Sequence, residues 1–152
     1  MSGLINTPEI LAEFERLKQI AMTQLARGIT VGLHDDSGSD SRGVSNAQKG
    51  IWNEFGTEHI PERSFLRATI FANTENYERL MGNMINDVVY ERITADEAYT
   101  ALGNRVVIDV KKAVTDFSSP ANAASTIAAK GFDNPLIETG AMRDAIAFKR
   151  VE

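Results

Sequence analysis

The sequence predicts an α+β fold, a single domain over residues 1–152 in which a small antiparallel sheet packs with three or four helices. Three observations predict it. Apolar residues recur every three or four positions in several long segments, which is typical of amphipathic helices. Short β-branched segments lie near both ends of the chain. Neither an internal repeat nor a domain-scale linker interrupts the chain, so one domain with one long polar loop is expected.

The first helix is expected over residues 8–27. Thr7 precedes Pro8, and proline is favoured at the first helical position because its missing N–H would be unpaired there anyway. Gly28 lies where a left-handed cap would end the helix. Helical spacing of the apolar residues predicts one stripe, formed by Ile10, Phe14, Leu17, Ala21 and Leu25.

A strand is expected at residues 29–33, where β-branched residues alternate, followed by a loop over residues 34–45. The loop is rich in Asp, Ser and Gly, which indicates a solvated segment and a mobile hairpin tip. Ser45 and Gln48 have capping-box spacing and begin a short helix that Gly56 ends. Its predicted apolar face comprises Ala47, Ile51, Trp52 and Phe55. Trp52, Phe55 and Phe65 are interpreted as core residues, with interface anchors as the alternative.

Two longer helices follow. Ile60 should be extended because Pro61 comes next, and a helix is expected from Phe65 into the early nineties, weakened by Gly82. Thr94 and Glu97 form a second capping box, which opens a helix to about residue 117. The predicted buried stripe of this helix comprises Ala98, Leu102, Val106, Val110, Ala113, Val114 and Phe117.

The segment 118–152 is expected to be more extended than the rest of the chain. A Ser/Pro/Asn linker at 118–124 precedes a helical turn at 125–130, which Gly131 closes. A short strand is predicted at Leu136-Ile137, a turn of helix at 139–146 and a final strand at 147–151.

Composition excludes several function classes. The formal net charge of −5 argues against a protein that grips nucleic-acid phosphates, because that task normally requires a basic face. The chain has no cysteine, so it has neither disulfides nor thiolate metal ligands. No apolar run approaches the roughly 20 residues that span a bilayer, and no secretory signal is visible. We therefore expect a soluble protein made in the cytoplasm, without a membrane partner.

No catalytic, cofactor or metal site is predicted. A metal-dependent hydrolase would need converging ligands, and the available set of His34, Asp35, Asp36 and His59 lacks helical spacing. Glu138-Thr139-Gly140 has the form of an aspartic-protease motif, but a single copy cannot build the two-carboxylate dyad. Arg63 and Arg67 are placed on one helical face, where an ion pair that fixes the loop or joins subunits is favoured over a phosphate contact.

Two linked stretches resemble a known family. The first is Asn53-Glu54-Phe55-Gly56-Thr57, followed by Pro61, Arg63 and Phe65-Leu66-Arg67. The second runs through Ser125-Thr126-Ile127, Lys130-Gly131, Pro135-Leu136-Ile137, Thr139-Gly140 and Met142-Arg143. Together with Val31-Gly32-Leu33 and Ile146, they are similar to the tail-component, or virion-morphogenesis, family of tailed bacteriophages. Ser64 and Glu138 depart from it, since the family usually has Pro and Asp there.

The resemblance implies a non-enzymatic structural protein that acts in tail completion or head–tail joining at the neck, as part of an oligomeric ring. Its implied partners are further copies of itself and neighbouring neck, connector or tail-tube proteins, and it would enclose DNA without binding it specifically. Its implied location is the virion, after synthesis in the host bacterial cytoplasm. A tail terminator that caps the tube is the alternative within this class, and a DNA-binding packaging or regulatory protein is the alternative outside it.

Assembly would require a head-to-tail interface between two different patches. We hypothesise that two turns supply it, with the equal alternative that these turns pack against each other within one subunit. The candidate interface residues are Asn53, Glu54, Phe55, Arg63, Phe65, Arg67, Leu136, Glu138, Thr139 and Arg143. A candidate inter-subunit loop, variable in the family, contains Asp35, Asp36, Asp40 and Arg42. Residues 118–134 are a second segment expected to order on assembly.

Overall fold

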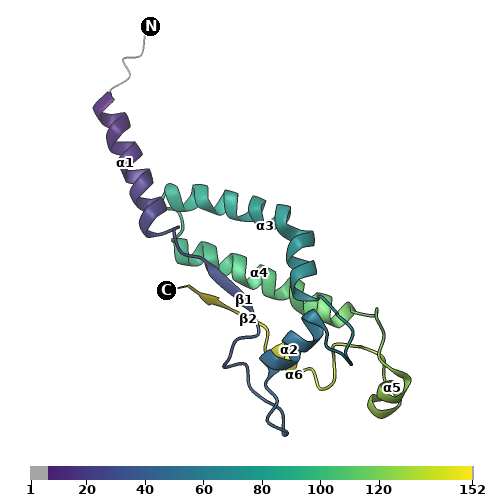
Figure 1. Ribbon diagram of the computed structural model, residues 1–152. Helices are drawn as coiled ribbons and strands as arrows, with labels where there is room; N and C mark the ends of the chain where they lie inside the picture. Colours follow the sequence, from purple (N-terminus) through teal and green to yellow (C-terminus); the bar gives the residue numbers. More distant parts are fainter. Residues whose placement is uncertain (1–6, 152) are drawn as a thin grey trace.

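The computed structural model describes residues 7–151. They form six helices and one two-stranded antiparallel sheet, which confirms the α+β prediction (Figure 1). Four helices have ten residues or more, and the remaining two are the short turns expected near the end of the chain. In chain order the elements are α1 (Thr7–Thr23), β1 (Ile29–Gly32), α2 (Asn46–Phe55), α3 (Leu66–Val89), α4 (Ala95–Asp116), α5 (Ala124–Lys130), α6 (Ala141–Asp144) and β2 (Ala147–Arg150).

Helix α4 is the centre of the fold. It begins at the predicted capping box, in which Thr94 and Glu97 exchange side-chain and backbone hydrogen bonds. It packs against α3, which is continuous through Gly82, and against both strands (Figure 1). The main core combines three residues of its predicted stripe with residues at the start of and within α3 and with residues of the C-terminal segment: Val106, Val110 and Val114, then Phe65 and Tyr77, then Leu136, Met142 and Ile146.

The sheet lies against α4 with a fixed register. Strand β1 pairs with β2 from Ile29 opposite Arg150 to Gly32 opposite Ala147. Gly103 on α4 leaves space for strand β2, since a Cβ at this position would overlap the ring of Phe148. Glycine is therefore required for the close approach of β2 to the helix.

Helix α1 ends earlier than predicted, and most of its residues lie outside the core. It stops at Thr23, before a turn, and Gly28 is not in the left-handed conformation that a cap requires. Only Ile20 of this helix is buried, in a small cluster with Val88, Ala95 and Ala98. The first part of the helix projects from the body (Figure 1), so Ile10 and Phe14 of its apolar stripe are exposed, whereas Leu17 and Leu25 are half-buried. Helical periodicity identified the helix but could not identify a neighbour.

Helix α2 buries a different face from the one predicted. Ser45 caps it by accepting a hydrogen bond from the Gln48 N–H, as expected. Its buried residues are Asn46, Gly50 and Glu54, whereas Ile51 and Phe55 are more than half exposed. Assigning Phe55 to the core was therefore wrong. Polar side chains take the inner face because they bind the loops on either side of the helix.

The C-terminal segment follows the prediction except at one position. Helix α5 ends at Gly131 in the left-handed conformation, and α6 and β2 lie where they were expected. Leu136-Ile137 is a turn rather than a strand, because the side chain of Asn134 accepts hydrogen bonds from both of their N–H groups. Among residues 7–151, no helix has the length and apolar character needed to cross a membrane.

Candidate functional site

Glu54 joins the end of α2 to the beginning of α3. It is only 4% exposed, and its carboxylate accepts hydrogen bonds from the backbone N–H groups of Leu66 and Arg67 at 2.9 and 3.0 Å. The Ser64 hydroxyl and the Arg67 Nε also donate to it, at 2.8 and 2.9 Å. A carboxylate at this place satisfies N–H groups that have no partner inside the helix and opposes the positive end of the helix dipole.

The ionisation of Glu54 follows from these contacts. Burial is the largest single influence and acts to raise the pKa of its carboxyl, but the backbone donors at Leu66 and Arg67 and the side chains of Arg67 and Ser64 together outweigh it. Its pKa therefore lies below the ordinary value, and the carboxylate is charged at neutral pH. This negative charge stabilises the turn between α2 and α3.

Arg63 is not on a helical face with Arg67, which corrects the prediction, because it lies before α3 begins. It is only 6% exposed, and burial lowers the pKa of its guanidinium. Its Nε and Nη2 donate to the carbonyls of Pro120 and Ala121 at 3.1 Å each, and its backbone N–H donates to the Asn53 carbonyl at 2.6 Å. Arg63 thus fastens the linker at 118–124 to the first motif.

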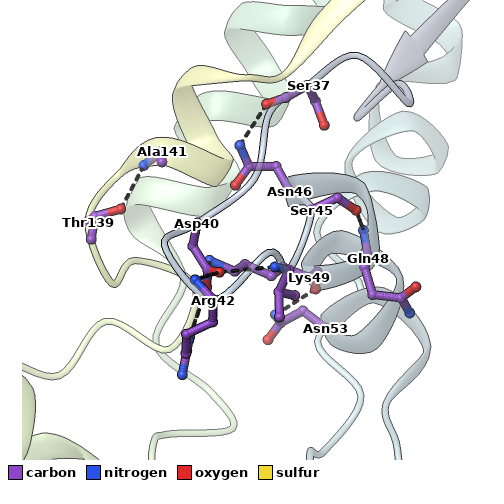
Figure 2. A network of polar contacts seen from close by, with 11 residues as sticks. Ser37, Asp40, Arg42, Ser45, Asn46, Gln48, Lys49, Asn53, Thr139 and Ala141 are labelled. Carbon is purple, nitrogen blue, oxygen red and sulfur yellow. Dashed lines mark hydrogen bonds and ion pairs between the residues drawn. The ribbon is translucent and has the colours of Figure 1, made fainter.

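The polar loop at 34–45 is tied down rather than free, as Figure 2 shows. Asp40 accepts from the Arg42 side chain at 2.9 Å and from the Val44 N–H at 3.0 Å, and it pairs with Lys49 on α2 at 2.9 Å. Hydrogen bonds from Lys49 and Arg42 hold the pKa of Asp40 well below its usual range. Asn46 donates to the Ser37 carbonyl at 2.7 Å, which closes the base of the loop.

Asn134 organises the second motif, and the sequence analysis did not identify it. Its side-chain amide donates to the Thr115 carbonyl at the end of α4 at 2.7 Å, while its Oδ1 accepts from the Leu136 N–H at 3.0 Å. Lys130 donates to the Asn134 carbonyl at 2.7 Å. The Asn-Pro dipeptide was the available signal, because asparagine before proline favours a side-chain-closed turn.

The two motifs form the walls of one open groove of about 730 Å³. The end of the polar loop, helix α2 and the following turn supply one wall, and the segment from Asn122 to Met142 supplies the other. The apolar part of the lining includes Val44, Trp52, Ile60, Pro135, Leu136 and Met142. Its charged lining consists of Arg42, Lys49, Lys130 and Glu138.

The ten candidate interface residues fall into three groups by burial. Those with structural roles inside the subunit are buried, namely Glu54, Arg63, Phe65 and Leu136. Phe55, Arg67, Glu138 and Thr139 are exposed, whereas Asn53 and Arg143 are half-buried. Arg67 lies over the ring of Phe55, 4.4 Å from its centre, and Arg143 pairs with Asp144 at 2.8 Å. Burial gives the first group an intramolecular role and leaves the exposed group available to a partner.

The candidate loop residues also have partners within the chain. Asp36 pairs with Lys149 on β2 at 2.6 Å, and Arg42 pairs with Asp40. His34 lies 3.0 Å from the Thr30 hydroxyl, and His59 is exposed in the turn after α2. Within residues 7–151, no three or more His, Asp or Glu side chains are arranged to hold a metal ion.

Comparisons of the chain with protein-family models, with curated proteins and with solved structures find no match.

Proposed function

We propose that this protein is a non-enzymatic structural protein of a tailed phage, which completes the tail or joins it to the head as one subunit of a ring at the neck. The motif resemblance to the virion-morphogenesis family supplies the class. One structural observation carries the proposal: α1 projects from the body with Ile10, Leu11 and Phe14 exposed at 53%, 59% and 61%. Apolar side chains grouped on a projecting helix favour a protein that is covered by a partner in its working state.

The charged residues of the first motif support a structural role. Glu54 and Arg63 are buried and hydrogen-bonded within the chain, so they fix the turns and do not face a substrate. The proposed partners are further copies of the chain and neighbouring neck, connector or tail-tube proteins. The acidic balance of the chain is compatible with a ring that encloses DNA without binding it specifically. The proposed location is the virion, with synthesis in the cytoplasm of the host bacterium.

Deletion of the gene from the phage or prophage that carries it tests the proposal, with the lysate imaged by electron microscopy. Filled heads beside separate tails are the expected result, and a plasmid copy should restore joined particles. Tails of uncontrolled length would favour the tail-terminator alternative. Normal, infectious particles in the deletion lysate would contradict the morphogenesis proposal.

A further inference from the structure

We infer that the groove between α2 and the C-terminal segment of one subunit receives helix α1 of the next subunit, so that copies of this chain join head to tail. The inference rests on the proposed function and deepens it by naming both halves of the subunit interface. Three observations support it. The first half of α1 is exposed, the groove has apolar surface and charges that complement this helix, and the two lie far apart in one molecule.

The part of the helix that would enter the groove is the first half of α1. Every residue from Thr7 to Glu15 is exposed, and Ile10, Phe14 and Leu17 follow the i, i+4, i+7 spacing with which a helix lies in a groove. Leu11 widens this apolar face. Packing supports this 17-residue helix mainly at Ile20, and its exposed half is marginal in water, because most helical stability in proteins comes from packing of the apolar face. Covering this face would stabilise the helix.

The groove is the surface that would receive this helix. Trp52, Ile60 and Met142 contribute apolar surface to it, and its volume is about 730 Å³. A tryptophan beside a groove is also the side chain most often found as an interface anchor. The groove is therefore suited to apolar side chains that stand on one face of a helix.

The charges of the two parts are complementary. The exposed half of α1 carries Glu9, Glu13 and Glu15 without a basic residue before Arg16, although Glu13 pairs with Arg16 and Glu15 with Lys18 on the following turn. The groove carries the three cations Arg42, Lys49 and Lys130 against Glu138 in the lining and Asp40 beside it, a formal balance of 3 − 2 = +1. Opposite charges orient partners as they approach and fix which end of a helix enters a groove.

The helix does not occupy the groove of its own subunit. Residue Ile20 of α1 packs with Ala98 near the start of α4, whereas Asn134 attaches the groove wall to Val114 and Thr115 near its end. Residues 98 and 114 are separated by 16 positions, or about 24 Å along a helix that rises 1.5 Å per residue. Figure 1 shows α1 and α2 at opposite ends of α4. An interface made of two different patches propagates head to tail and closes into a ring if its rotation closes.

Two full-chain variants test the inference by complementation. Phe14→Glu removes the helix anchor and leaves the groove intact, whereas Trp52→Ala changes the groove and leaves the helix intact. Each variant alone should sediment as one chain of 16.7 kDa, and an equimolar mixture should form complexes of twice that mass that do not extend further. Trp52 is the only tryptophan, so the mixture should also shift the fluorescence of the Phe14→Glu subunit to the blue. Ala12→Glu, on the opposite side of α1, is the matched control and should self-associate like the wild type.

Both variants must melt within a few degrees of the wild type, since they alter exposed or half-buried side chains. Failure of the mixture to form a complex, or self-association of Phe14→Glu equal to that of the wild type, would overturn the inference. The same holds if Phe14→Glu restores joined particles fully in the deletion strain, and the proposed function would then stand. Normal particles in the deletion lysate would overturn the function while leaving the sedimentation result unaffected.

Discussion

Glu54, in the last turn of α2, holds Arg67, in the first turn of α3, through both its backbone N–H and its guanidinium, at 3.0 and 2.9 Å. The same carboxylate accepts from Leu66, so one side chain sets the angle at which two helices leave the intervening turn. That turn carries Arg63, which in turn holds the linker at 118–124. The first motif, from Glu54 to Arg67, thus joins α2 to α3 in a fixed arrangement, and we call it the joint. The groove lies on its outer side.

Glu54→Gln should destabilise the fold by about 2 kcal/mol, or lower Tm by roughly 4–8 °C, because charge-assisted hydrogen bonds to a buried carboxylate are lost. Urea unfolding followed by circular dichroism measures the change. Glu58→Gln removes an exposed carboxylate from the same turn and should leave the free energy of unfolding within about 0.5 kcal/mol of the wild type. Equal effects of the two substitutions would exclude the proposed joint.

The contribution of Glu54 should depend on pH in a defined direction. Its pKa in the folded protein lies below the ordinary value of 4.5, so the unfolded state takes up the proton first as the pH falls. The stability that the carboxylate contributes is therefore complete above about pH 5 and is lost as the pH falls through the folded-state pKa. The difference in unfolding free energy between the wild type and Glu54→Gln should be constant from pH 7 to 6 and shrink below pH 4.5. A difference that stays constant to pH 3 would contradict this role.

Arg63→Met should loosen the linker at 118–124, because the carbonyls of Pro120 and Ala121 lose their donor. We expect faster cleavage of this segment in limited proteolysis, together with a stability loss of about 1–3 kcal/mol. Arg79→Met is the control, since Arg79 is exposed and its side chain bonds to Asn76 on its own helix. Linker cleavage at the wild-type rate in Arg63→Met would show that the linker is held by other contacts.

Two glycine-to-alanine substitutions should change the free energy of unfolding in opposite directions. Gly103→Ala places a Cβ against the ring of Phe148 and should cost about 1–3 kcal/mol through overpacking. A Cβ at Gly82, on the exposed side of α3, would meet no atom within 4 Å, so Gly82→Ala should stabilise the fold by about 0.5–1 kcal/mol. Thermal unfolding of both variants provides the comparison. Stabilisation by Gly103→Ala would mean that β2 does not lie as close to α4 as the structure has it.

Sequence patterns predicted the helices whose caps and apolar stripes are formed by residues close together in the chain. The α4 capping box needs only Thr94 and Glu97, three residues apart, and the α4 stripe repeats over the whole helix, so both were identified. Gly131 ends α5 for an equally local reason. The α1 stripe was identified just as well, but what covers it could not be predicted, because periodicity describes a face of a helix and not its neighbour.

The joint and the groove depend on contacts between distant residues. Glu54 bonds residues 10 to 13 positions further along the chain, and Arg63 bonds carbonyls more than 50 positions away. No sequence-spacing rule connects such distant pairs. The first motif could therefore be identified as a whole stretch, but the contacts of its individual residues could not be predicted. Asn134 was missed because its amide fixes a turn in an apolar segment that β-propensity assigns to a strand.

The most direct test of the head–tail role is the position of the protein in intact particles. A small epitope tag after Val151, at the exposed end of β2, allows labelling with antibody-coated gold and imaging by electron microscopy. The proposed role predicts gold at the junction of head and tail in most particles, with none along the tail or at its tip. Particles that carry no label, in a lysate where the tagged protein is present and free, would contradict it.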